Sequence, residues 1–373
     1  MSRRKIFLLY PYYWPHFKAG GPVQSLFNLV TIFGGEFDFY ILSLNKDIDY
    51  SEPLETLQLG KWSRGLNQEN IYYASLISPY LIYAKMREVE PDVVSINGIF
   101  HWNTSLFGLI AAKLLRRNVI LSPRGMLQAW ALQRGRWKKN LYLALFKNVL
   151  SKNEIWHATD RQEQNDIYTN FGKSQVVHVA SNIPRMIGEG SVIPFPAVSK
   201  KIQLIFLSLV NPNKNLHLVI EAVRQFENFR LDIYGPVMNE EYWKSCQLRM
   251  QGVEHISYKG SVLPWNVPSL ISTYHFLVLP TQGENFGHAI FDSLASGVPV
   301  IISKNTPWME IAERQAGWYI DIENASSLVN TLKNITALDQ SEYNAYRINS
   351  LEYARRYWQT NDFRQQYHFL LND

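Results

Sequence analysis

The sequence predicts an α/β protein of two domains, each built around a parallel sheet. At 373 residues the chain is longer than one hydrophobic core usually serves. Short apolar runs alternate with segments of helical periodicity along its whole length. Residues 186–200 are rich in Gly, Pro and Ser and lack periodicity, which indicates a linker. We therefore predict a first domain over residues 1–185, a second over 201–350, and a C-terminal helix, 351–373, that packs back on the first domain.

The first domain begins with an apolar strand, Ile6–Tyr10, then a loop containing Gly20 and Gly21, then the helix Val23–Phe33. The next strands are expected at Phe37–Leu44, Ile71–Ala74, Asp92–Ile96, Val119–Leu121, Glu154–Ala158 and Val176–Val179. The next helices are expected at Pro79–Glu88, Ser105–Leu115, Trp137–Leu150 and Arg161–Phe171. The stretch Lys46–Asn70 is polar and is predicted to be irregular.

The second domain repeats this alternation. Its strands are expected at Ile202–Ser208, Leu231–Tyr234, Ile256–Lys259, Phe276–Leu279, Val300–Ser303 and Trp318–Ile320. Its helices are expected at Leu216–Phe226, Glu240–Met250, Pro268–Ile271, His288–Ala295 and Trp308–Ala312, with further helices from Ser326 on. Parallel sheets of this kind bind ligands at the carboxyl ends of their strands.

The stretch from Phe276 to Ser303 carries the strongest local signal for a ligand site. A strand leads into a polar turn with Glu284, and Asp292 lies one turn into the following helix. The amides of residues 285–288 are then the unpaired donors of a helix N-terminus, which suit an anion such as a phosphate. The alternative interpretation is an ordinary strand–turn–helix unit with solvated acids.

The charge is distributed unevenly over the chain. The net charge is +5, and ten Lys and Arg residues but no acid lie within residues 113–153. One interpretation is a solvated helix face, the usual fate of a charge run. The other is docking on an anionic membrane surface, with apolar side chains at the interface. Those side chains are Trp130, Trp137, Leu141, Tyr142, Leu145 and Phe146.

The absence of several common motifs argues against some classes of protein. The chain has no G-x-G-x-x-G after its first strand and no P-loop, which argues against nicotinamide dinucleotide binding and P-loop NTPases. The single Cys246 excludes a disulfide framework and fits a reducing compartment. The basic start is followed by an apolar run, Ile6–Leu9, that is too short for a signal peptide, and no run approaches a membrane span. Asp47-Ile48-Asp49 resembles a metal-binding Asp-x-Asp, but no further ligand supports it.

Several longer segments resemble one known family. In the second domain these are FLSLVNPNKN, LDIYGP, ISYKGSV, LPTQGENFGHAIFDSLASGVPV and NTPW; in the first they are AGGPVQSLFNL, SPRGMLQAWALQRGRWKK and IWHATDRQEQNDI. Over nearly its whole length the chain resembles the retaining GT-B glycosyltransferases of family 4, the glycosyl transferases group 1, and most closely members of bacterial polysaccharide and lipopolysaccharide assembly. The resemblance implies two Rossmann-like domains with parallel sheets facing across a cleft, the first for the acceptor and the second for the nucleotide-sugar donor.

The resemblance implies roles for residues of the second domain. The family's pair of glutamates falls on Glu284, expected to contact donor-sugar hydroxyls, and on Asp292, one methylene shorter and expected to bind ribose hydroxyls. Lys214 matches the lysine that binds the diphosphate, and Leu209 stands where the family usually has a second cation, an arginine. Further donor contacts are implied for Gly235, Pro236, Lys259, Gly260, Val262, Asn285, Phe286, Gly287 and His288.

In the first domain, Gly20 and Gly21 match a glycine loop that approaches the donor phosphate and the acceptor. Arg124 stands where many members have a catalytic-site histidine, and we hypothesise that Arg124 or Lys18 replaces the missing arginine. His101 follows a strand end and is a candidate catalytic residue, although a lone histidine is more often structural.

The predicted activity is retaining transfer of a sugar from a UDP-sugar, with GDP as the alternative nucleotide, to a glycan or a polyprenyl-diphosphate-linked glycan. No metal or other cofactor is expected, because protein cations and helix amides can neutralise the leaving phosphate. We expect a cytoplasmic protein, bound peripherally at the inner face of the plasma membrane through residues 113–153. Two other classes stay open: a non-catalytic nucleotide-sugar or glycan-binding protein on a degenerate scaffold, which Leu209 and Asp292 favour, and a nucleic-acid-binding protein, for which no module is found.

Overall fold

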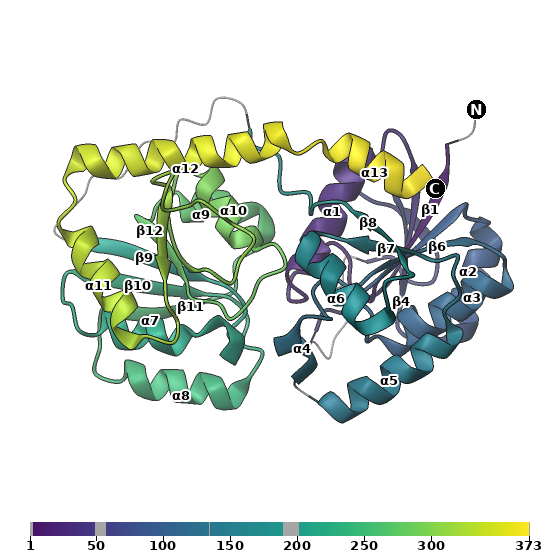
Figure 1. Cartoon of the computed structure of the whole chain (residues 1–373), viewed down its shortest axis with the longest axis horizontal. Helices are drawn as coiled ribbons and strands as arrows, with labels where there is room; N and C mark the ends of the chain where they lie inside the picture. Colours follow the sequence, from purple (N-terminus) through teal and green to yellow (C-terminus); the bar gives the residue numbers. More distant parts are fainter. Residues whose placement is uncertain (1–2, 49–56, 134, 189–200, 373) are drawn as a thin grey trace. The chain divides into compact units, whose positions relative to one another are not determined.

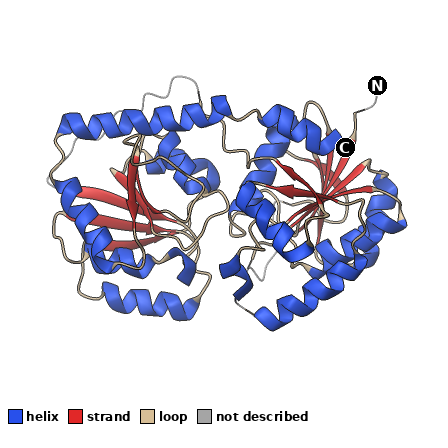
Figure 2. Ribbon diagram, viewed as in Figure 1, coloured by secondary structure: helices blue, strands red, loops and turns tan. Residues whose placement is uncertain are grey.

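The computed structural model describes residues 3–48, 57–133, 135–188 and 201–372. These residues form two compact units, shown by chain position in Figure 1 and by secondary structure in Figure 2. The N-terminal unit extends to Ile183 and regains the chain from Asp362 onward, whereas Pro184–Asn361 form the C-terminal unit. Of the predicted linker, 186–200, residues 189–200 lie outside the described residues.

The sheet of the N-terminal unit has the strand order β3-β4-β2-β1-β5-β6-β7-β8. Its strands are β1 (Lys5–Leu9), β2 (Asp38–Leu44), β3 (Trp62–Arg64), β4 (Asn70–Ala74), β5 (Val93–Asn97), β6 (Asn118–Ser122), β7 (Ile155–Ala158) and β8 (Val176–Val179). All neighbours pair in parallel except the edge strand β3, which runs antiparallel to β4. The carboxyl ends of seven strands therefore meet at one edge.

The helices of the N-terminal unit are α1 (Gly21–Phe33), α2 (Pro79–Val89), the π-helix η1 (Trp102–Phe107), α3 (Gly108–Leu114), α4 (Ala129–Gln133), α5 (Arg136–Val149), α6 (Arg161–Phe171) and α13 (Phe363–Asn372). Side-chain caps define two of their starts. Ser78 accepts from the Leu81 amide at α2, and Asp160 accepts from the Glu163 amide at α6.

The sheet of the C-terminal unit is parallel throughout, with the strand order β11-β10-β9-β12-β13-β14. The strands are β9 (Ile202–Leu207), β10 (Phe229–Tyr234), β11 (Ile256–Gly260), β12 (Phe276–Leu279), β13 (Val300–Ser303) and β14 (Gly317–Ile320). Every residue of β12 and β13 is buried, as expected of central strands covered on both faces.

The helical elements of this unit are η2 (Pro212–Lys214), α7 (Leu216–Val223), α8 (Glu240–Met250), η3 (Pro264–Asn266), α9 (Val267–Ile271), α10 (His288–Ala295), α11 (Ala325–Thr336) and α12 (Gln340–Thr360). They pack in two groups: α7 contacts α8 and α11, whereas α10 contacts α9 and α12. The predicted alternation of strands and helices around two parallel sheets is confirmed.

The chain returns to the N-terminal unit later than residue 351. Helix α12 belongs to the C-terminal unit, and only α13 packs in the N-terminal one. There the Tyr367 ring lies 5.7 Å from the Phe33 ring and 5.6 Å from the His157 ring. The Ser181 amide donates to Gln366 Oε1 at 2.9 Å. Aromatic packing thus fixes α13 against α1 and the end of β7.

Two sequence predictions of local structure were wrong. Residues 308–312 form a loop that ends in a turn instead of a helix, because Glu310 has a φ of 60° and the Tyr319 hydroxyl pairs with both the Trp308 carbonyl and the Ile311 amide. The stretch predicted to be irregular contains β3, where the Trp62 ring packs edge-on against Tyr40 and Tyr72, each at 5.5 Å. In both places a tertiary contact decides the backbone conformation.

Gly235 provides a test of close backbone packing. Its φ is 135°, and a Cβ there would lie 1.8 Å from the Ser208 carbonyl oxygen. We expect Gly235→Ala to destabilise the C-terminal unit by roughly 3 kcal/mol or more, which lowers its melting midpoint by roughly 6 °C or more. Gly252 has a φ of 74° and open space, so Gly252→Ala should cost only about 1–2 kcal/mol. Equal midpoints in differential scanning calorimetry would refute the steric argument.

Candidate active site

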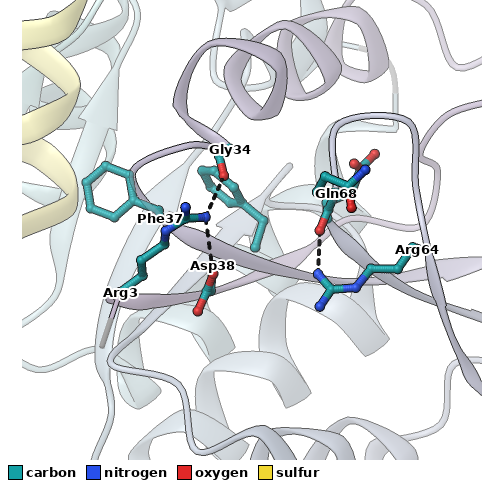
Figure 3. Close-up of a pocket in the computed structure, with 8 residues that line it drawn as sticks. Arg3, Gly34, Phe37, Asp38, Arg64 and Gln68 are labelled. Atoms are coloured by element: carbon teal, nitrogen blue, oxygen red, sulfur yellow. Dashed lines mark hydrogen bonds and ion pairs between the residues drawn. The ribbon is translucent and has the colours of Figure 1, made fainter. Parts of the chain in front are cut away.

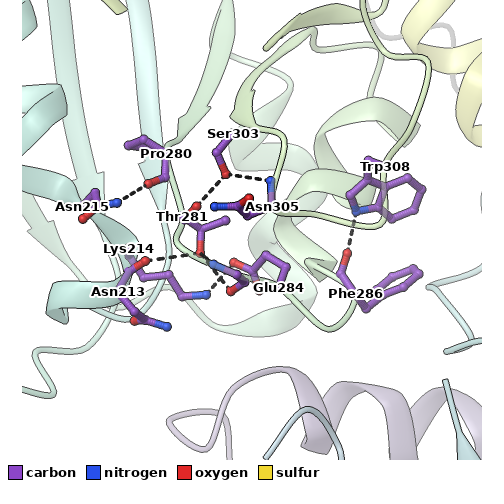
Figure 4. A network of polar contacts seen from close by, with 11 residues as sticks. Asn213, Lys214, Asn215, Pro280, Thr281, Glu284, Phe286, Ser303, Asn305 and Trp308 are labelled. Carbon is purple, nitrogen blue, oxygen red and sulfur yellow. Dashed lines mark hydrogen bonds and ion pairs between the residues drawn. The ribbon is translucent and has the colours of Figure 1, made fainter. Parts of the chain in front are cut away.

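Lys214 and Glu284 meet at the carboxyl end of the C-terminal sheet. Lys214 ends the short helix after β9, and Glu284 lies in the loop after β12, the neighbouring strand. Although 70 residues separate them in sequence, Lys214 Nζ lies 2.5 Å from Glu284 Oε1 (Figure 4). Their side chains are only 10% and 13% exposed, so little water screens the pair. The structure brings together the two strongest predicted catalytic residues of this domain.

Backbone-directed hydrogen bonds lock the loops that carry this pair. The Asn215 side chain donates to the Pro280 carbonyl at 2.8 Å, and the Gln282 amide donates to the Asn213 carbonyl at 2.7 Å. The Glu284 amide donates to the Asn305 carbonyl at 3.1 Å. These bonds tie together the ends of β9, β12 and β13, so the ion pair has a rigid frame (Figure 4).

The N-terminus of α10 follows directly after Glu284. In the described chain the amides of Phe286 and Gly287 donate no hydrogen bond, so they fit the predicted anion site. The Phe286 ring is buried and packs against Trp308 at 5.0 Å, and its carbonyl accepts from Trp308 Nε1 at 2.5 Å. Its side chain therefore belongs to the core, and only its amide can serve a ligand. Asn285 and His288 lie on either side of these two residues.

Three polar atoms beside this frame lack a hydrogen-bond partner within the described ranges. They are Asn211 Oδ1, Asn213 Oδ1 and Thr306 Oγ1, and all three atoms are buried. Buried polar atoms are nearly always paired, so unpaired ones next to an ion pair indicate positions for ligand hydroxyls or water. Sequence analysis missed them, since Asn and Thr in loops are common and only the fold brings the loops after β9 and β13 to the loop of Glu284.

Asp292, the second predicted acid, lies on the first turns of α10 and is 7% exposed. Arg185 Nε lies 3.6 Å from its Oδ1. Burial raises the pKa of Asp292 to about 6, and the positive charge of Arg185 acts in the opposite direction. Sequence analysis did not find Arg185, because it stands at the start of a stretch without pattern.

The residues predicted to flank the nucleotide lie at the ends of β10 and β11. The Gly235 amide donates to the Gly260 carbonyl at 2.9 Å, and its conformation is required by the contact with Ser208. Lys259 Nζ lies 3.7 Å from Asp232 Oδ1, and Arg230 Nε lies 3.4 Å from the same oxygen. Val262 is partly buried against the core, and the Pro236 carbonyl accepts from the Val210 amide at 2.9 Å. The structure places these residues at neighbouring strand ends, and their roles stay predictions.

Arg124 occupies the corresponding edge of the N-terminal sheet, just after β6. It is 9% exposed and has a φ of 57°. Its Nε and Nη2 donate to Asn97 Oδ1 at 3.0 and 2.8 Å, and its Nη1 donates to Asn182 Oδ1 at 2.9 Å. Both partners are neutral, and no described carboxylate lies within ion-pair distance of the guanidinium. An almost buried cation without an anion is a candidate ligand for phosphate.

Buried polar groups fix the loop that carries Arg124. Glu163 Oε1 accepts from the Gly125 amide at 2.6 Å. His157 Nε2 donates to the Ala180 carbonyl at 2.8 Å, so its Nδ1 accepts from the Ser122 hydroxyl at 3.0 Å. Burial, with the nearby charge of Arg124, lowers the pKa of His157 to about 3. This histidine therefore stays neutral, and its two hydrogen bonds connect Ser122 to Ala180.

His101, the remaining catalytic candidate, is neutral and in contact with aromatic residues. Burial lowers its pKa, and its ring lies 5.7 Å edge-on from the Tyr10 ring. Its Nε2 is buried and has no hydrogen-bond partner in the described chain. A Cβ at Gly98 would lie 2.9 Å from its ring, so the glycine makes room for it. The position after the end of β5 fits the prediction, and its catalytic role stays a prediction.

The glycine loop reaches the start of α1. Gly20 has a φ of 74°, Gly21 opens the helix, and no side chain caps it. The buried carboxylate of Asp47 accepts from the amides of Phe17 and Lys18 at 2.8 and 3.0 Å, so this acid holds the loop. Asp49, its partner in the metal-like motif, lies outside the described residues. No group of three or more His, Cys, Asp and Glu side chains with metal-binding geometry occurs in the described ranges.

A separate hollow of about 330 Å³ lies at the amino ends of β2 and β4 (Figure 3). Its lining residues are Arg3, Gly34, Phe37, Asp38, Phe39, Arg64, Gln68 and Glu69. It contains none of the predicted site residues. It also lies at the edge of the sheet opposite to the one where parallel sheets bind ligands, and we assign it no role.

A comparison with known protein families identifies a domain that contains the Lys214–Glu284 pair. Residues 194–351 match the family model of glycosyl transferases group 1. A putative colanic acid biosynthesis glycosyltransferase, WcaL of Escherichia coli K12, is 23% identical over 160 residues; the match covers 40% of this chain and 39% of the relative. The C-terminal unit thus contains a glycosyl transferases group 1 domain, and the predicted enzyme class is confirmed at this level.

Solved structures resemble the chain over nearly its full length. Anabaena Alr3699/HepE in complex with UDP-glucose has a TM-score of 0.74 at 16% identity and covers 99% of this chain and 100% of its own. Sucrose-phosphate synthase from Thermosynechococcus elongatus has a TM-score of 0.73 at 14% identity, covering 99% and 100%. WaaG, a glycosyltransferase of lipopolysaccharide biosynthesis, has a TM-score of 0.67 at 14% identity, covering 99% and 98%. The predicted GT-B fold is confirmed.

The Lys214–Glu284 pair should be visible in stability measurements. Because both side chains are largely buried, Lys214→Met or Glu284→Gln alone leaves a charge without its partner. The double variant should therefore lose less stability than the sum of the singles, with a coupling of roughly 1–3 kcal/mol by calorimetry. The exposed pair Arg314–Glu310 is the control and should give about 0.3–0.5 kcal/mol. Strict additivity at Lys214 and Glu284 would contradict this account.

Proposed function

We propose that the chain is a retaining glycosyltransferase that moves a sugar from a UDP-sugar to a glycan or lipid-linked glycan in bacterial surface polysaccharide synthesis. The observation that carries the proposal is the Lys214–Glu284 pair beside the open amides of α10, within a glycosyl transferases group 1 domain. The bound UDP-glucose of Alr3699/HepE supports the choice of nucleotide, and WcaL and WaaG support the polysaccharide context.

The described side chains supply the chemistry that the transfer requires. When the bond between the sugar C1 and the diphosphate oxygen breaks, negative charge develops on the leaving nucleoside diphosphate. Lys214 and the amides of Phe286 and Gly287 are positioned to stabilise that charge. Glu284, held by Lys214, accepts hydrogen bonds from donor-sugar hydroxyls. The acceptor oxygen then bonds C1 on the same face, and its proton passes to the leaving phosphate oxygen.

Arg124 is proposed as a further cation for the leaving phosphate. Its guanidinium is oriented by two neutral amides and lacks an acid, so its charge remains available to an anion. This fits the hypothesis that it replaces the arginine missing at Leu209, with Lys18 as the alternative. The proposed transfer needs no metal ion. If protein groups alone neutralise the diphosphate, activity should persist in excess EDTA.

Release of UDP from a panel of UDP-sugars tests the proposed activity. We expect turnover with at least one donor, and a fall in kcat of roughly 100-fold or more in Lys214→Gln and Glu284→Gln. Glu221→Gln is the matched control, since Glu221 is an exposed acid of the same unit that pairs with Arg249. Tight UDP-sugar binding without release of UDP, alone or with glycan acceptors, would instead favour the non-catalytic binding protein.

Asp292 should make donor binding depend on pH. Its pKa is about 6, above the usual 3.8, so the carboxyl gains a proton and loses acceptor strength as the pH falls through 6. We expect UDP-glucose, or the best donor of the panel, to bind about tenfold more weakly at pH 5 than at pH 7.5. Asp292→Asn should bind weakly with a flat profile. Calorimetric titration measures both, and a flat wild-type profile would exclude this role for the ionised acid.

We also propose that α5 docks the protein on an anionic membrane surface. Trp137, Leu141 and Leu145 are spaced along one side of the helix and are 69%, 57% and 42% exposed, and Lys138 Nζ lies 5.5 Å from the centre of the Trp137 ring. Apolar side chains flanked by cations are typical of helices that lie in the membrane interface.

Other residues first expected at this interface have different places. Tyr142 and Phe146 belong to the core, which corrects the prediction that they lie at the interface. The Trp130 side chain lies outside the described part of the structure. No helix in the described chain is long and apolar enough to cross a membrane.

Vesicle flotation tests the docking proposal. The protein should float with vesicles containing phosphatidylglycerol and not with pure phosphatidylcholine vesicles, because the basic helix needs an anionic surface. The double variant Trp137→Ser with Leu141→Ser should lose most of this binding. Leu248→Ser, which changes an equally exposed leucine of α8, should retain it. Equal flotation with neutral vesicles, or none with anionic ones, would count against docking.

A further inference from the structure

Strand β8 lies at one edge of the N-terminal sheet. It pairs with β7 on one side, and no strand pairs with its other side in the part of the chain that the structure describes. The Ala180 amide donates to the Ala158 carbonyl at 2.9 Å, so alternate residues of this segment direct their backbone groups towards β7. By that alternation, the amides and carbonyls of Val177 and Val179 face outward. Another strand can pair with these groups.

Natural sheets usually protect such an edge with a charge, a bulge, a very short strand or a cover. The other edges of the two described sheets follow this rule. β3 has only three residues and contains Arg64; β11 contains Lys259 and pairs with β10 through a register shift; no residue of β14 is exposed. β8 has the sequence Val-Val-His-Val, with both end residues exposed and no Lys, Arg, Asp, Glu or Pro. It lacks the usual protection.

Exposed apolar side chains surround this edge. Val176 and Val179 are 46% and 38% exposed, and Phe369 of α13 is 60% exposed. The Phe369 ring stacks on the His178 ring at 4.6 Å, with an angle of 26° between the rings. Open backbone groups flanked by exposed apolar side chains are typical of a strand that pairs with another chain.

We propose that β8 pairs antiparallel with β8 of a second copy of this chain, so that the two N-terminal sheets become continuous. A two-fold axis perpendicular to the sheet brings the same segment of both copies together. One register uses all the outward groups: Val177 of each copy lies opposite Val179 of the other, which gives roughly four hydrogen bonds. His178 then lies opposite His178 of the second copy, with Phe369 stacked beside each. This inference does not depend on the proposed function.

Charges beside the strand favour a second copy as the partner. In this register Lys173, which is exposed, lies opposite residue 183 of the other copy, because both are equally far from the centre of the pairing. Ser181, close to residue 183, bonds to Gln366, one helical turn after the exposed Asp362. Each copy therefore brings a cation towards an acidic helix start of the other, and opposite charges that face each other across a sheet stabilise the pairing.

Sedimentation equilibrium of the full chain tests the association. At concentrations of roughly 1–100 µM the wild type should reach twice the mass of one chain. Val179→Pro removes an outward amide and keeps the bonds to β7, so it should raise the dimer dissociation constant roughly tenfold or more. A wild type that stays monomeric, or a folded Val179→Pro variant with wild-type affinity, would overturn the inference.

Phe369→Ser is a second variant, which leaves the backbone of β8 unchanged. It removes an exposed apolar side chain, so the monomer should stay folded while the dimer weakens roughly tenfold. Leu66→Ser is the matched control and should keep the wild-type affinity, since Leu66 is 70% exposed and follows β3 at the opposite edge of the same sheet. Equal dissociation constants in these two variants would contradict the proposal.

A disulfide tests the register. His178→Cys places two thiols at a non-hydrogen-bonded pair, whose Cα atoms lie about 4.5 Å apart and within reach of a disulfide. Mild oxidation should then give a covalent dimer on a non-reducing gel. The wild type, whose single Cys246 is buried, and Leu66→Cys should remain monomeric on that gel. Absence of the cross-link in His178→Cys would exclude this strand pairing.

Discussion

The ion pair between Lys214 and Glu284 is the contact on which the geometry of the donor side depends. Both side chains are largely buried but still reach the surface, so water screens their charges only weakly. Each side chain is the counter-charge of the other at the end of a buried strand. The pair can form only because β9 and β12 are neighbours in the sheet, although the chain between them contains two further strands, three α-helices and two short 3-10 helices. The topology therefore creates the charge arrangement that a phosphate would meet.

Much of this architecture could be predicted from the sequence. Helix α10 has the predicted bounds, because Gly287 and the Gly297 turn interrupt an otherwise clear helical pattern on either side. The loop at residues 308–312 could not be predicted, since Tyr319, on a later strand, supplies the hydrogen bonds that a helix would otherwise make. Local pattern predicts an element well when its own residues satisfy its backbone, and poorly when a distant side chain does so.

The site shows the same division. Glu284 and Asp292 were found because a strand, a turn and a helix mark their positions, and Lys214 was found through the resemblance to a known family, whereas Arg185 lies in a segment without periodicity. Its importance comes from three contacts, to Pro264, Trp358 and Asp292, that no spacing rule connects. Arg124 was found, but its two asparagine partners were not recognised as such. They show that its orientation is set by neutral groups, which leaves its charge uncompensated.

The return of the chain at Asp362 affects how the protein is made. Helix α13 supplies Tyr367 to the rings of Phe33 and His157, and the Tyr367 hydroxyl contacts Arg124. A ribosome produces these residues only after the entire C-terminal unit. Until then, the aromatic surface around α1 in the N-terminal unit lacks its contacts with α13. Its Arg124 loop reaches its final environment only when synthesis has passed residue 367, so the first unit to be translated is the last to be completed.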